Sequence, residues 1–377
     1  MNFDFTDDQN SLRDAVSRWV DKAFSFERRH ALAKAGGATR EVYGELAELG
    51  LTGLVVPEAQ GGMGFGPVEA MVVMEELGRG LVNAPYAAAA LVAPTLLSAA
   101  PAALQITWLP KIASAQALVV LAHQERAARY RLHHVTTRAT PAGDGHVLDG
   151  LKSVVPAGDE ADAYIVPARL SGDAGDAAGI GLFVVAREAV GATVRGYPTQ
   201  DGARAAELTL VATQASLITA DGGALLEQAA DVGIAAACAE AVGLMDRLLA
   251  LTVEYMNTRK QFGVPIASFQ ALRHRIADVK LQLELGRSMS YYASLKLGDA
   301  APARRRALSQ AKVQLGSSMR FVGQQCLQLH GGIGMTDEYI GSHIFKRLTM
   351  LELQFGDTLH HLGEVSDRMQ DTAGVFA

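Results

Sequence analysis

Hydrophobic positions in the first third of the chain recur at helical spacing. One amphipathic run is marked by Phe3, Phe5, Leu12, Val16 and Val20. A second run, containing Val42 and Leu46, ends at Gly50, and a third follows as VEAMVVMEELGRG. Apolar residues three or four positions apart are typical of a helix that buries one face. The pattern therefore predicts that residues 1–118 are helical.

The pattern changes after residue 118. Short alternating runs rich in valine and threonine, such as GIGLFVVA and RAAELTLV, are separated by turn residues across 119–215. Alternation of period two is typical of strands with one buried face. Residues 216–377 return to long helical periodicity, broken near Gly263–Pro265, Asp299–Pro302 and Gly331–Gly334. We therefore expect a mainly α protein with a small middle β domain, divided at 1–118, 119–215 and 216–377.

Composition narrows the class of protein. Of 377 residues, 49% are hydrophobic and 20% charged, which fits a soluble globular chain with a large core. The net charge of -6 argues against a nucleic-acid surface, and no run of about 18 apolar residues predicts a membrane span. The first ten residues, MNFDFTDDQN, do not read as a secretory signal. With only Cys238 and Cys326 there is no disulfide framework, so we expect a cytoplasmic protein.

Two kinds of site are disfavoured by spacing. The stretch GGMGFG at 61–66 has the spacing G-x-G-x-G, lacks the βαβ context of a dinucleotide loop, and is entered through Pro57, so a surface turn is favoured. The adjacent pairs His133–His134 and His360–His361 cannot share one helix face, and no Cys/His/carboxylate cluster has ligand spacing. We predict no metal site.

Two other stretches favour a nucleotide. EYMNTRKQFGVPIASFQ at 254–270 ends a helix in a basic pair and an aromatic residue, and QLHGGIGMTDEY at 328–339 removes side chains from a backbone edge. Arginine offers a planar fork for a diphosphate, and phenylalanine a flat face for a purine. Together they suit the ADP half of a dinucleotide. The alternatives are that Arg259 stabilises a helix C-terminus and that the glycines form a cap.

The same stretches closely resemble the signatures of acyl-CoA dehydrogenases. YMNTRKQFGVPIASFQALRHRIADV at 255–279, QLHGGIGMTDEY, and AELGLTGLVVPEAQGGMGFG all match, so the resemblance covers essentially the whole chain. It implies an α-helical N-terminal domain, a β-barrel-like middle domain and a C-terminal four-helix bundle, assembled as dimers of dimers. It also implies FAD as cofactor, an acyl-CoA substrate and electron-transfer flavoprotein as acceptor.

The resemblance assigns a role to six residues. In the family, the matching positions hold the ADP portion of the FAD that belongs to the neighbouring subunit. They are Arg259, Phe262, Gln270, Gln328, Gly331 and Gly332. The family reaction is α,β-dehydrogenation of the thioester, in which a carboxylate removes the α proton and the β hydride moves to the flavin.

The sequence departs from the family where that chemistry occurs. Phe355 and Gly233 stand at the two positions where the family places its base, so we predict no catalytic residue. Val154, Val155 and Pro156 replace the Trp, Ile and Thr beside the flavin ring. The loop HQERAARY (123–130) lacks the family's glycine-rich flavin loop.

The departures favour a degenerate subunit. The chain resembles the small subunit of heteromeric bacterial enzymes such as pimeloyl-CoA dehydrogenase, which would complete the FAD site of a catalytic partner. One alternative is a self-sufficient homo-oligomer that uses Glu240 as an unusual base, with Asp357 a weaker choice. The structural interpretation of Glu240 is a partly buried carboxylate that pairs with a residue of another helix, with an arginine as one option. Another alternative is a non-catalytic relative that binds acyl-CoA.

Overall fold

The computed structural model describes residues 4–143 and 145–369, so Phe3 of the first predicted run lies outside it. Its contacts divide the chain into two compact units. The first contains the residues up to His30, Pro67–Val82 and those from Ile234 onward, and the second contains Ala31–Gly66 and Asn83–Gly233. Since these units are defined by contacts and not by chain order, the predicted three-part linear division stays a prediction.

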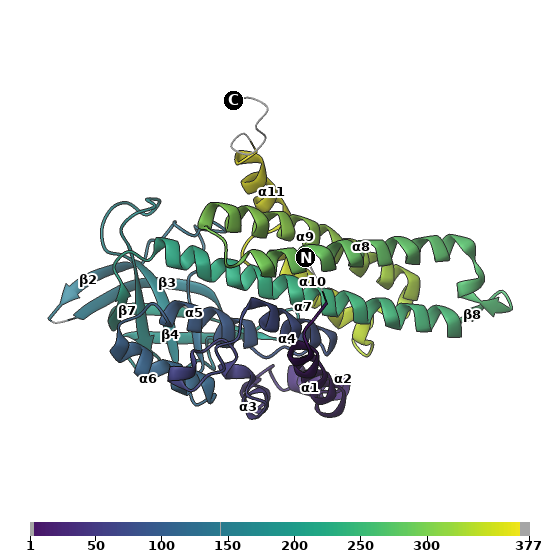
Figure 1. Cartoon of the computed structure of the whole chain (residues 1–377), viewed down its shortest axis with the longest axis horizontal. Helices are drawn as coiled ribbons and strands as arrows, with labels where there is room; N and C mark the ends of the chain where they lie inside the picture. Colours follow the sequence, from purple (N-terminus) through teal and green to yellow (C-terminus); the bar gives the residue numbers. More distant parts are fainter. Residues whose placement is uncertain (1–3, 144, 370–377) are drawn as a thin grey trace. The chain divides into compact units, whose positions relative to one another are not determined.

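The first unit is helical, as predicted for both ends of the chain (Figure 1). Its helices are α1 (Asp7–Ala23), the start of α2 (Phe26–Lys34), α4 (Pro67–Arg79), most of α7 (Gly223–Thr258), α8 (Gln270–Lys296), α9 (Ala301–His330), α10 (Ile340–Leu353) and α11 (Thr358–Asp367). The predicted breaks are confirmed. They correspond to the hairpin of β8 (Lys260–Gln261) and β9 (Val264–Pro265), the α8–α9 turn, and a 3₁₀ turn at Gly331–Met335.

Glycines let two helices of this unit approach closely. A Cβ added to Gly78 of α4 would lie 2.2 Å from the Glu240 carbonyl oxygen, and one added to Gly243 of α7 would lie 1.9 Å from the Glu75 carbonyl oxygen. Both distances are far below van der Waals contact, so the α4–α7 crossing requires glycine on each side. The apolar core beside this crossing is formed by α7, α8, α9 and α10.

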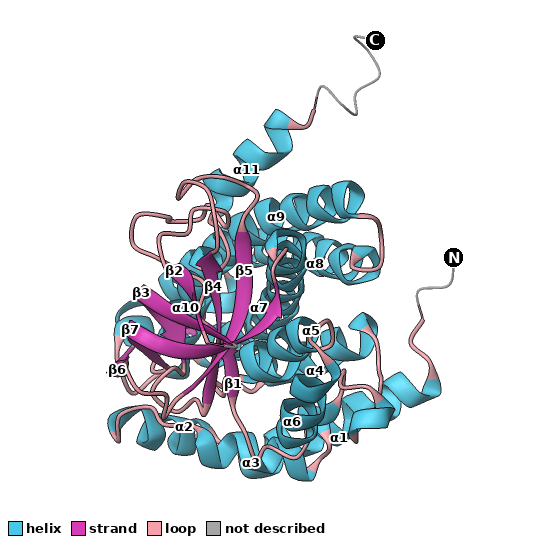
Figure 2. Cartoon of the chain, turned by 90° about the vertical axis from the view of Figure 1, so that its left-hand side faces the viewer, coloured by secondary structure: helices cyan, strands magenta, loops and turns pink. Residues whose placement is uncertain are grey.

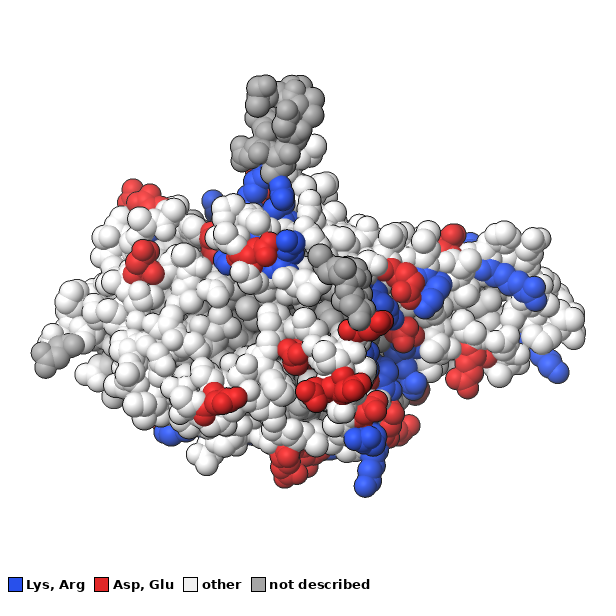
Figure 3. Space-filling view, in the orientation of Figure 1, with Lys and Arg blue, Asp and Glu red and all other residues white. Residues whose placement is uncertain are grey.

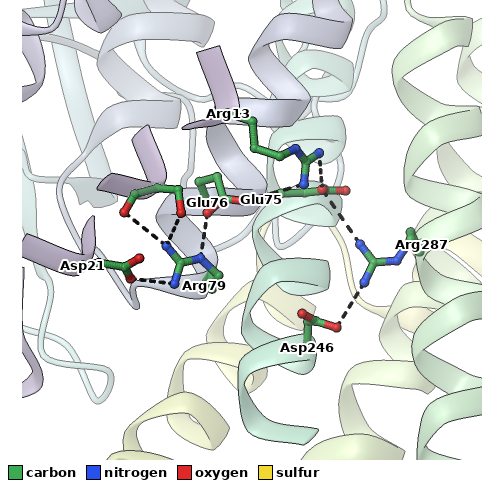
Figure 4. Close-up of polar contacts among 8 residues, drawn as sticks. Arg13, Asp21, Glu75, Glu76, Arg79, Asp246 and Arg287 are labelled. Atoms are coloured by element: carbon green, nitrogen blue, oxygen red, sulfur yellow. Dashed lines mark hydrogen bonds and ion pairs between the residues drawn. The ribbon is translucent and has the colours of Figure 1, made fainter. Parts of the chain in front are cut away.

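A charged network also joins α1, α4, α7 and α8 (Figure 4). The Glu75 carboxylate, 3% exposed, accepts from Arg13 at 2.9 Å, and Arg287 lies 3.9 Å from it while pairing with Asp246 at 3.2 Å. Burial raises the pKa of Glu75, although Arg13 and Arg287 oppose the rise. Because a buried carboxylate without cations would be costly, the two arginines fix the relative placement of these helices.

The second unit contains the predicted β region (Figure 2). Its strands are β1 (Val119–Leu121), β2 (Arg138–Ala142), β3 (Gly145–Pro156), β4 (Ala163–Arg169), β5 (Ile180–Ala186), β6 (Ala192–Pro198) and β7 (Arg204–Thr219). The pairings β4–β5, β5–β7, β7–β3, β3–β2 and β2–β4 close a ring. β1 pairs with β4 and β6 with β7 outside this ring. The mainly α fold with a barrel-like middle region is therefore confirmed.

The helical part of the second unit covers the barrel's apolar side. Beside the remainder of α2 it holds α3 (Arg40–Glu48), a π-helix at Ala87–Val92, α5 (Ala93–Leu97) and α6 (Ala102–Ala113). Leu96 and Leu97 share a core with Ile165 of β4 and Leu226 at the start of α7. The stretch 61–66 follows a 3₁₀ turn and not a strand, which agrees with the predicted surface turn. None of the helices within the described residues has the length and apolar character needed to cross a bilayer.

Candidate cofactor-binding site

The β8–β9 hairpin carries Phe262, one of the six predicted cofactor residues, and Arg259 directly precedes it. The hairpin joins α7 to α8 at the far right of Figure 1. Gln261 pairs with Val264, so the turn contains only Phe262 and Gly263, with φ of 54° and 81°. Such a two-residue turn matches the twist of its strands but favours asparagine or glycine at its first position. Phe262 is nonetheless there, with 92% of its surface exposed and its ring edge-on to Phe269 at 6.1 Å.

Arg259 lies at the base of this hairpin. Its backbone N–H donates to the Tyr255 carbonyl at 2.8 Å, and its carbonyl accepts from Ile266 at 2.9 Å. Its exposed guanidinium forms no hydrogen bond or ion pair with any described residue, and the same holds for the amides of Gln270 and Gln328. A guanidinium bound only by water is available for a phosphate or carboxylate.

The glycine edge, defined here as Gly331 and Gly332, is equally open. Gly331 has φ 64° and ψ -141°, a conformation essentially restricted to glycine. A Cβ added to either glycine would meet no atom within 4 Å. Packing within the described chain therefore does not explain why both residues lack side chains. Space beside exposed backbone is what a bound nucleotide requires.

In the wall segment, residues 150–158 at the end of β3, Lys152 is engaged within the chain, while the buried Ser153 hydroxyl has no hydrogen-bond partner among the described residues. Lys152 is fully buried, and its Nζ donates to Glu125 at 2.6 Å. Glu125 also accepts from Thr136 N–H at 2.7 Å, Thr137 N–H at 3.1 Å and Thr137 Oγ1 at 2.8 Å, as well as from Thr136 Oγ1. Ser153 N–H donates to Gln124 O at 2.8 Å. The loop after β1 is thus hydrogen-bonded to the wall segment through Glu125 and Gln124.

Burial and mutual attraction shift the pKa values of Lys152 and Glu125. Burial lowers the pKa of Lys152 to about 8, against the attraction of Glu125. Burial alone would raise the pKa of Glu125, but Lys152 and the Thr136 bonds lower it to about 2. His123 is half-buried, and its desolvation together with the Lys152 charge lowers its pKa to about 4. The Glu125 carboxylate therefore stays ionised and fully hydrogen-bonded.

The Glu240 carboxylate is held by Arg347 of α10. Arg347 Nε donates to one oxygen at 2.5 Å and its terminal nitrogen to the other at 2.8 Å. Glu240 is 4% exposed, so it forms a buried bidentate ion pair between two helices. This agrees with the structural interpretation of Glu240 as a paired carboxylate. Asp357 is engaged as well, because its side chain caps α11 by accepting from His360 N–H at 2.8 Å.

One histidine cluster could not be found from spacing. His30, Asp337 and His343 place their ligand atoms within 4.8 Å of one another. However, Nδ1 of His343 lies 2.9 Å from the Arg29 guanidinium, which only donates, and its Nε2 lies 2.7 Å from the Asp337 carbonyl, which only accepts. Both ring nitrogens are thus occupied, and the cluster fits a packing role better than a metal site.

Comparison with known proteins places the chain in a family. Models of the acyl-CoA dehydrogenase N-terminal and C-terminal domains match residues 6–116 and 220–370. L-Prolyl-[peptidyl-carrier protein] dehydrogenase of Pseudomonas fluorescens is 30% identical over 325 residues, covering 79% of this chain and 84% of the relative. Benzylmalonyl-CoA dehydrogenase of Aromatoleum aromaticum is 30% identical over 307 residues, covering 78% and 80%. The chain belongs to the acyl-CoA dehydrogenase family.

Solved structures agree with this assignment. The Tcur3481-Tcur3483 steroid ACAD G363A variant is 28% identical, with a TM-score of 0.87 over 97% of this chain and 99% of that one. The predicted acyl-CoA dehydrogenase fold is therefore confirmed. Members of this family are flavoprotein oxidoreductases.

The structure shows where the residues lie at which this chain differs from the motifs of the acyl-CoA dehydrogenase family. Val154 sits in a bulge of β3 with φ 51° and 45% exposure, and Val155 is buried. Pro156 has neither a hydroxyl nor an N–H to offer a flavin ring. Arg129, in the loop that lacks the family's glycines, adopts φ 48°. Pro156 therefore cannot replace the polar donor that the resemblance places beside the flavin ring, and the Ser153 hydroxyl is the segment's buried donor without a partner among the described residues.

By resemblance, two positions match the family's base, and neither holds a side chain that can accept a proton. Phe355, with φ 56°, forms the corner between α10 and α11, and Gly233 is buried in α7. Buried Lys312 donates to the Leu351 and Gln354 carbonyls at 2.5 and 2.8 Å, and His361 Nε2 lies 3.0 Å from the Phe355 carbonyl. The corner keeps a defined backbone although its side chain cannot accept a proton.

Proposed function

We propose that this chain is a subunit of an acyl-CoA dehydrogenase assembly that supplies the ADP-binding side of a FAD site, while a related chain supplies the flavin wall and the base. The observation that carries the proposal is a contrast within one sequence. The six nucleotide-side residues are exposed, and their polar side chains have no partner among the described residues. The positions that would serve the ring and the substrate hold Val154, Pro156, Gly233 and Phe355.

Each nucleotide-side residue has a chemical task in this proposal. Arg259 binds the pyrophosphate through its planar fork, and Phe262 covers the adenine face. The glycine edge presents backbone groups at close range, and the Gln328 amide precedes it in sequence, while Gln270 at the start of α8 offers a second exposed amide. When bound, FAD supplies the two-electron oxidation of the acyl-CoA, with the hydride accepted at the flavin.

Exposed apolar side chains on the same unit support assembly with another chain. Phe262, Met335, Leu281 and Leu285 expose 92%, 73%, 57% and 42% of their surfaces. Leu281 and Leu285 are one turn apart on α8 and so share a face. On the side shown in Figure 3, positive and negative side chains are interspersed along the α7–α8 end. An apolar face with mixed charge fits a protein partner of similar make-up.

The remaining details of the proposal follow the family. We infer a dimer of dimers with a catalytic partner, electron-transfer flavoprotein as acceptor, and a bulky acyl-CoA of the dicarboxylic or steroid side-chain type. The 28% identical structure is named as a Tcur3481-Tcur3483 steroid enzyme, which supports a two-chain assembly and a steroid-type substrate. The free, buried Cys238 and Cys326 agree with a cytoplasmic location.

The test measures where FAD is retained. The full chain is purified alone and together with a related acyl-CoA dehydrogenase chain that carries an intact base and wall, each with excess FAD. We expect little flavin on the chain alone and one FAD per pair of chains in the assembly. Arg259→Ala should accelerate FAD release from the assembly at least tenfold, because a charge-assisted phosphate bond contributes about 1.5–3 kcal/mol. Lys260→Ala, which removes the adjacent exposed cation, is the matched control.

Other outcomes point elsewhere. Near-full flavin occupancy of the chain alone would mean that the wall segment still accepts a flavin ring and would favour the homo-oligomeric enzyme. No flavin in any assembly would leave a non-catalytic relative. Equal effects of Arg259→Ala and Lys260→Ala would show that only net charge matters.

A further inference from the structure

Three aromatic rings meet where the hairpin and the glycine edge begin. His330 is the last residue of α9, directly before Gly331, and is 3% exposed. Its ring centroid lies 4.6 Å from that of Tyr255 in α7 and 4.8 Å from that of Tyr339, the residue before α10. All three rings belong to the first unit. One buried side chain thus contacts two other helical segments at the start of the glycine edge.

Hydrogen bonds fix the orientation of the His330 ring. Its Nδ1 lies 2.8 Å from the Cys326 carbonyl, which only accepts, so Nδ1 carries the hydrogen. Nε2 is then an acceptor, and the Tyr339 hydroxyl donates to it at 2.6 Å. Both ring nitrogens are engaged in a buried setting, which determines the tautomer. The ring is therefore oriented by α9 on one side and by Tyr339 on the other, and the backbone of Leu251 in α7 also contacts it.

Tyr255 connects this stack to the hairpin. Its ring packs on His330 with an interplanar angle of 30°, and its carbonyl accepts the Arg259 N–H at 2.8 Å. The base of the hairpin and the end of α9 are therefore joined through one residue. Arg259 and Gly331, which the proposed function assigns to the same nucleotide, are each adjacent to this joint.

A histidine that only packs in the core would form the same hydrogen bonds. His330, however, directly precedes two glycines whose backbone must be held by neighbouring residues. Gly331 and Gly332 have no side chains to anchor them, and nothing packs within 4 Å of their would-be Cβ atoms. On the far side of the turn, a Cβ on Gly334 would lie 3.1 Å from His330 Cβ. The turn at 331–335 is thus closely packed at Gly334, next to His330, and open at Gly331 and Gly332. An open backbone without such support would sample several orientations, and ordering it when the nucleotide binds would carry an entropic cost.

We propose that His330 and Tyr339 are positioning residues: their hydrogen bond, braced by the Tyr255 ring, holds the glycine edge in the orientation that binds the ADP portion of FAD. The inference rests on the proposed function, and it adds a determinant that contacts no part of the cofactor. It assigns to Tyr339 the task of keeping exposed backbone ordered before the cofactor arrives.

The test removes one oxygen. Tyr339→Phe keeps the ring over His330 and deletes the hydroxyl. In the full chain, amide hydrogen exchange across 331–335 should become roughly threefold to tenfold faster, as expected for loss of one buried hydrogen bond. FAD release from the assembly should accelerate by a similar factor. Tyr292→Phe, which removes a phenolic oxygen from α8, is the matched control and should change neither rate.

Arg259→Ala in the same assembly separates the two ideas. If Arg259→Ala accelerates FAD release while Tyr339→Phe leaves it unchanged, the proposed function stands and the positioning role is wrong. Unchanged exchange at 331–335 in Tyr339→Phe also overturns it. If neither variant changes FAD release, the proposed function fails and this inference fails with it. Faster exchange together with faster release, with Tyr292→Phe unchanged, supports the positioning role.

Discussion

The glycine edge with its hairpin and the wall segment of β3 use their polar groups in opposite ways. At the wall segment, Lys152 is buried and donates to Glu125, which takes further hydrogen bonds from two threonines. At the hairpin and glycine edge, Arg259 has no side-chain partner among the described residues, and Gly331 borders open space. By resemblance both regions match cofactor-contacting parts of the family. The second presents exposed donors, whereas the unpartnered Ser153 hydroxyl of the wall segment is buried.

The α10–α11 corner behaves like the wall segment. Lys312 binds the Leu351 and Gln354 carbonyls, and Asp357 caps the following helix. A buried polar group that is fully satisfied inside the chain stabilises the fold but has no bonding capacity left for a ligand. The contrast teaches that engagement of polar groups, and not fold alone, separates the part of this chain that we propose to bind a cofactor from the part that stabilises the fold.

The largest expected effect breaks the internal network of the wall segment. Lys152→Met leaves the Glu125 carboxylate buried without its cation, and removal of one partner of a buried pair costs about 3–5 kcal/mol. Denaturant unfolding should show this loss in the free energy of unfolding. Arg126→Met, which removes an exposed partner of Glu207, should leave that free energy unchanged. Equal stability of Lys152→Met and the parent would mean that the pair is not a structural support.

A second variant tests whether Glu240 belongs with the engaged groups or with the chemistry. Glu240→Gln replaces a bidentate ion pair with a neutral amide beside Arg347, which should cost about 2 kcal/mol, as for a hydrogen bond to a charged group. Turnover of the assembly at a temperature well below unfolding should be unchanged. If turnover falls more than a hundredfold while the variant stays folded, Glu240 is the base and the assembly needs no other.

Sequence patterns predicted the elements of this fold well, because helical and strand periodicities are local properties. The breaks at 263–265 and 331–334 were predicted from glycine and proline alone. The first lies in the hairpin that follows the end of α7 at Thr258, and the second directly follows the end of α9 at His330. The partners of Lys152, Glu240 and His330 lie 27, 107 and 9 residues away, and nothing in the sequence sets these pairings. For His330 a signal existed, a histidine before two glycines with a tyrosine beyond, but only the folded chain shows that they touch.

The pH dependence of stability offers a third test, now at the α10–α11 corner. Burial lowers the pKa of Lys312 from its ordinary 10.5 to about 8. Between these values the unfolded chain holds a proton that the folded chain has released, so this group makes the free energy of unfolding rise with pH. The slope for one proton is at most about 1.4 kcal/mol per pH unit. Unfolding curves at pH 7, 8, 9 and 9.5 should show a smaller slope in Lys312→Met than in the parent.

That difference in slope isolates Lys312, since Lys152 and the buried tyrosines titrate alike in both proteins. Identical slopes would mean that burial does not lower the pKa of Lys312 in the folded chain, as expected of a solvated lysine. The contrast between the two regions would then rest on the wall segment alone.

The smallest expected effect has opposite signs for stability and binding, and it tests the open region directly. Phe262 occupies the first position of a two-residue turn with φ 54°, where asparagine is favoured, and its ring is almost fully exposed. Phe262→Asn should therefore raise the free energy of unfolding by about 0.5–1 kcal/mol, because left-handed backbone suits asparagine better. The same variant should release FAD faster from the assembly, since the flat face over the adenine is lost.

Gly263→Ala is the matched control for this turn. A Cβ at Gly263 meets no atom within 4 Å, so the substitution adds backbone strain without a steric clash and should cost about 1 kcal/mol. If Phe262→Asn stabilises the chain and FAD release is unchanged, the strained phenylalanine has no role at the cofactor. If it stabilises the chain and weakens FAD retention, the turn keeps an unfavourable residue because the neighbouring nucleotide needs its ring, which is how strain at a binding site is expected to persist.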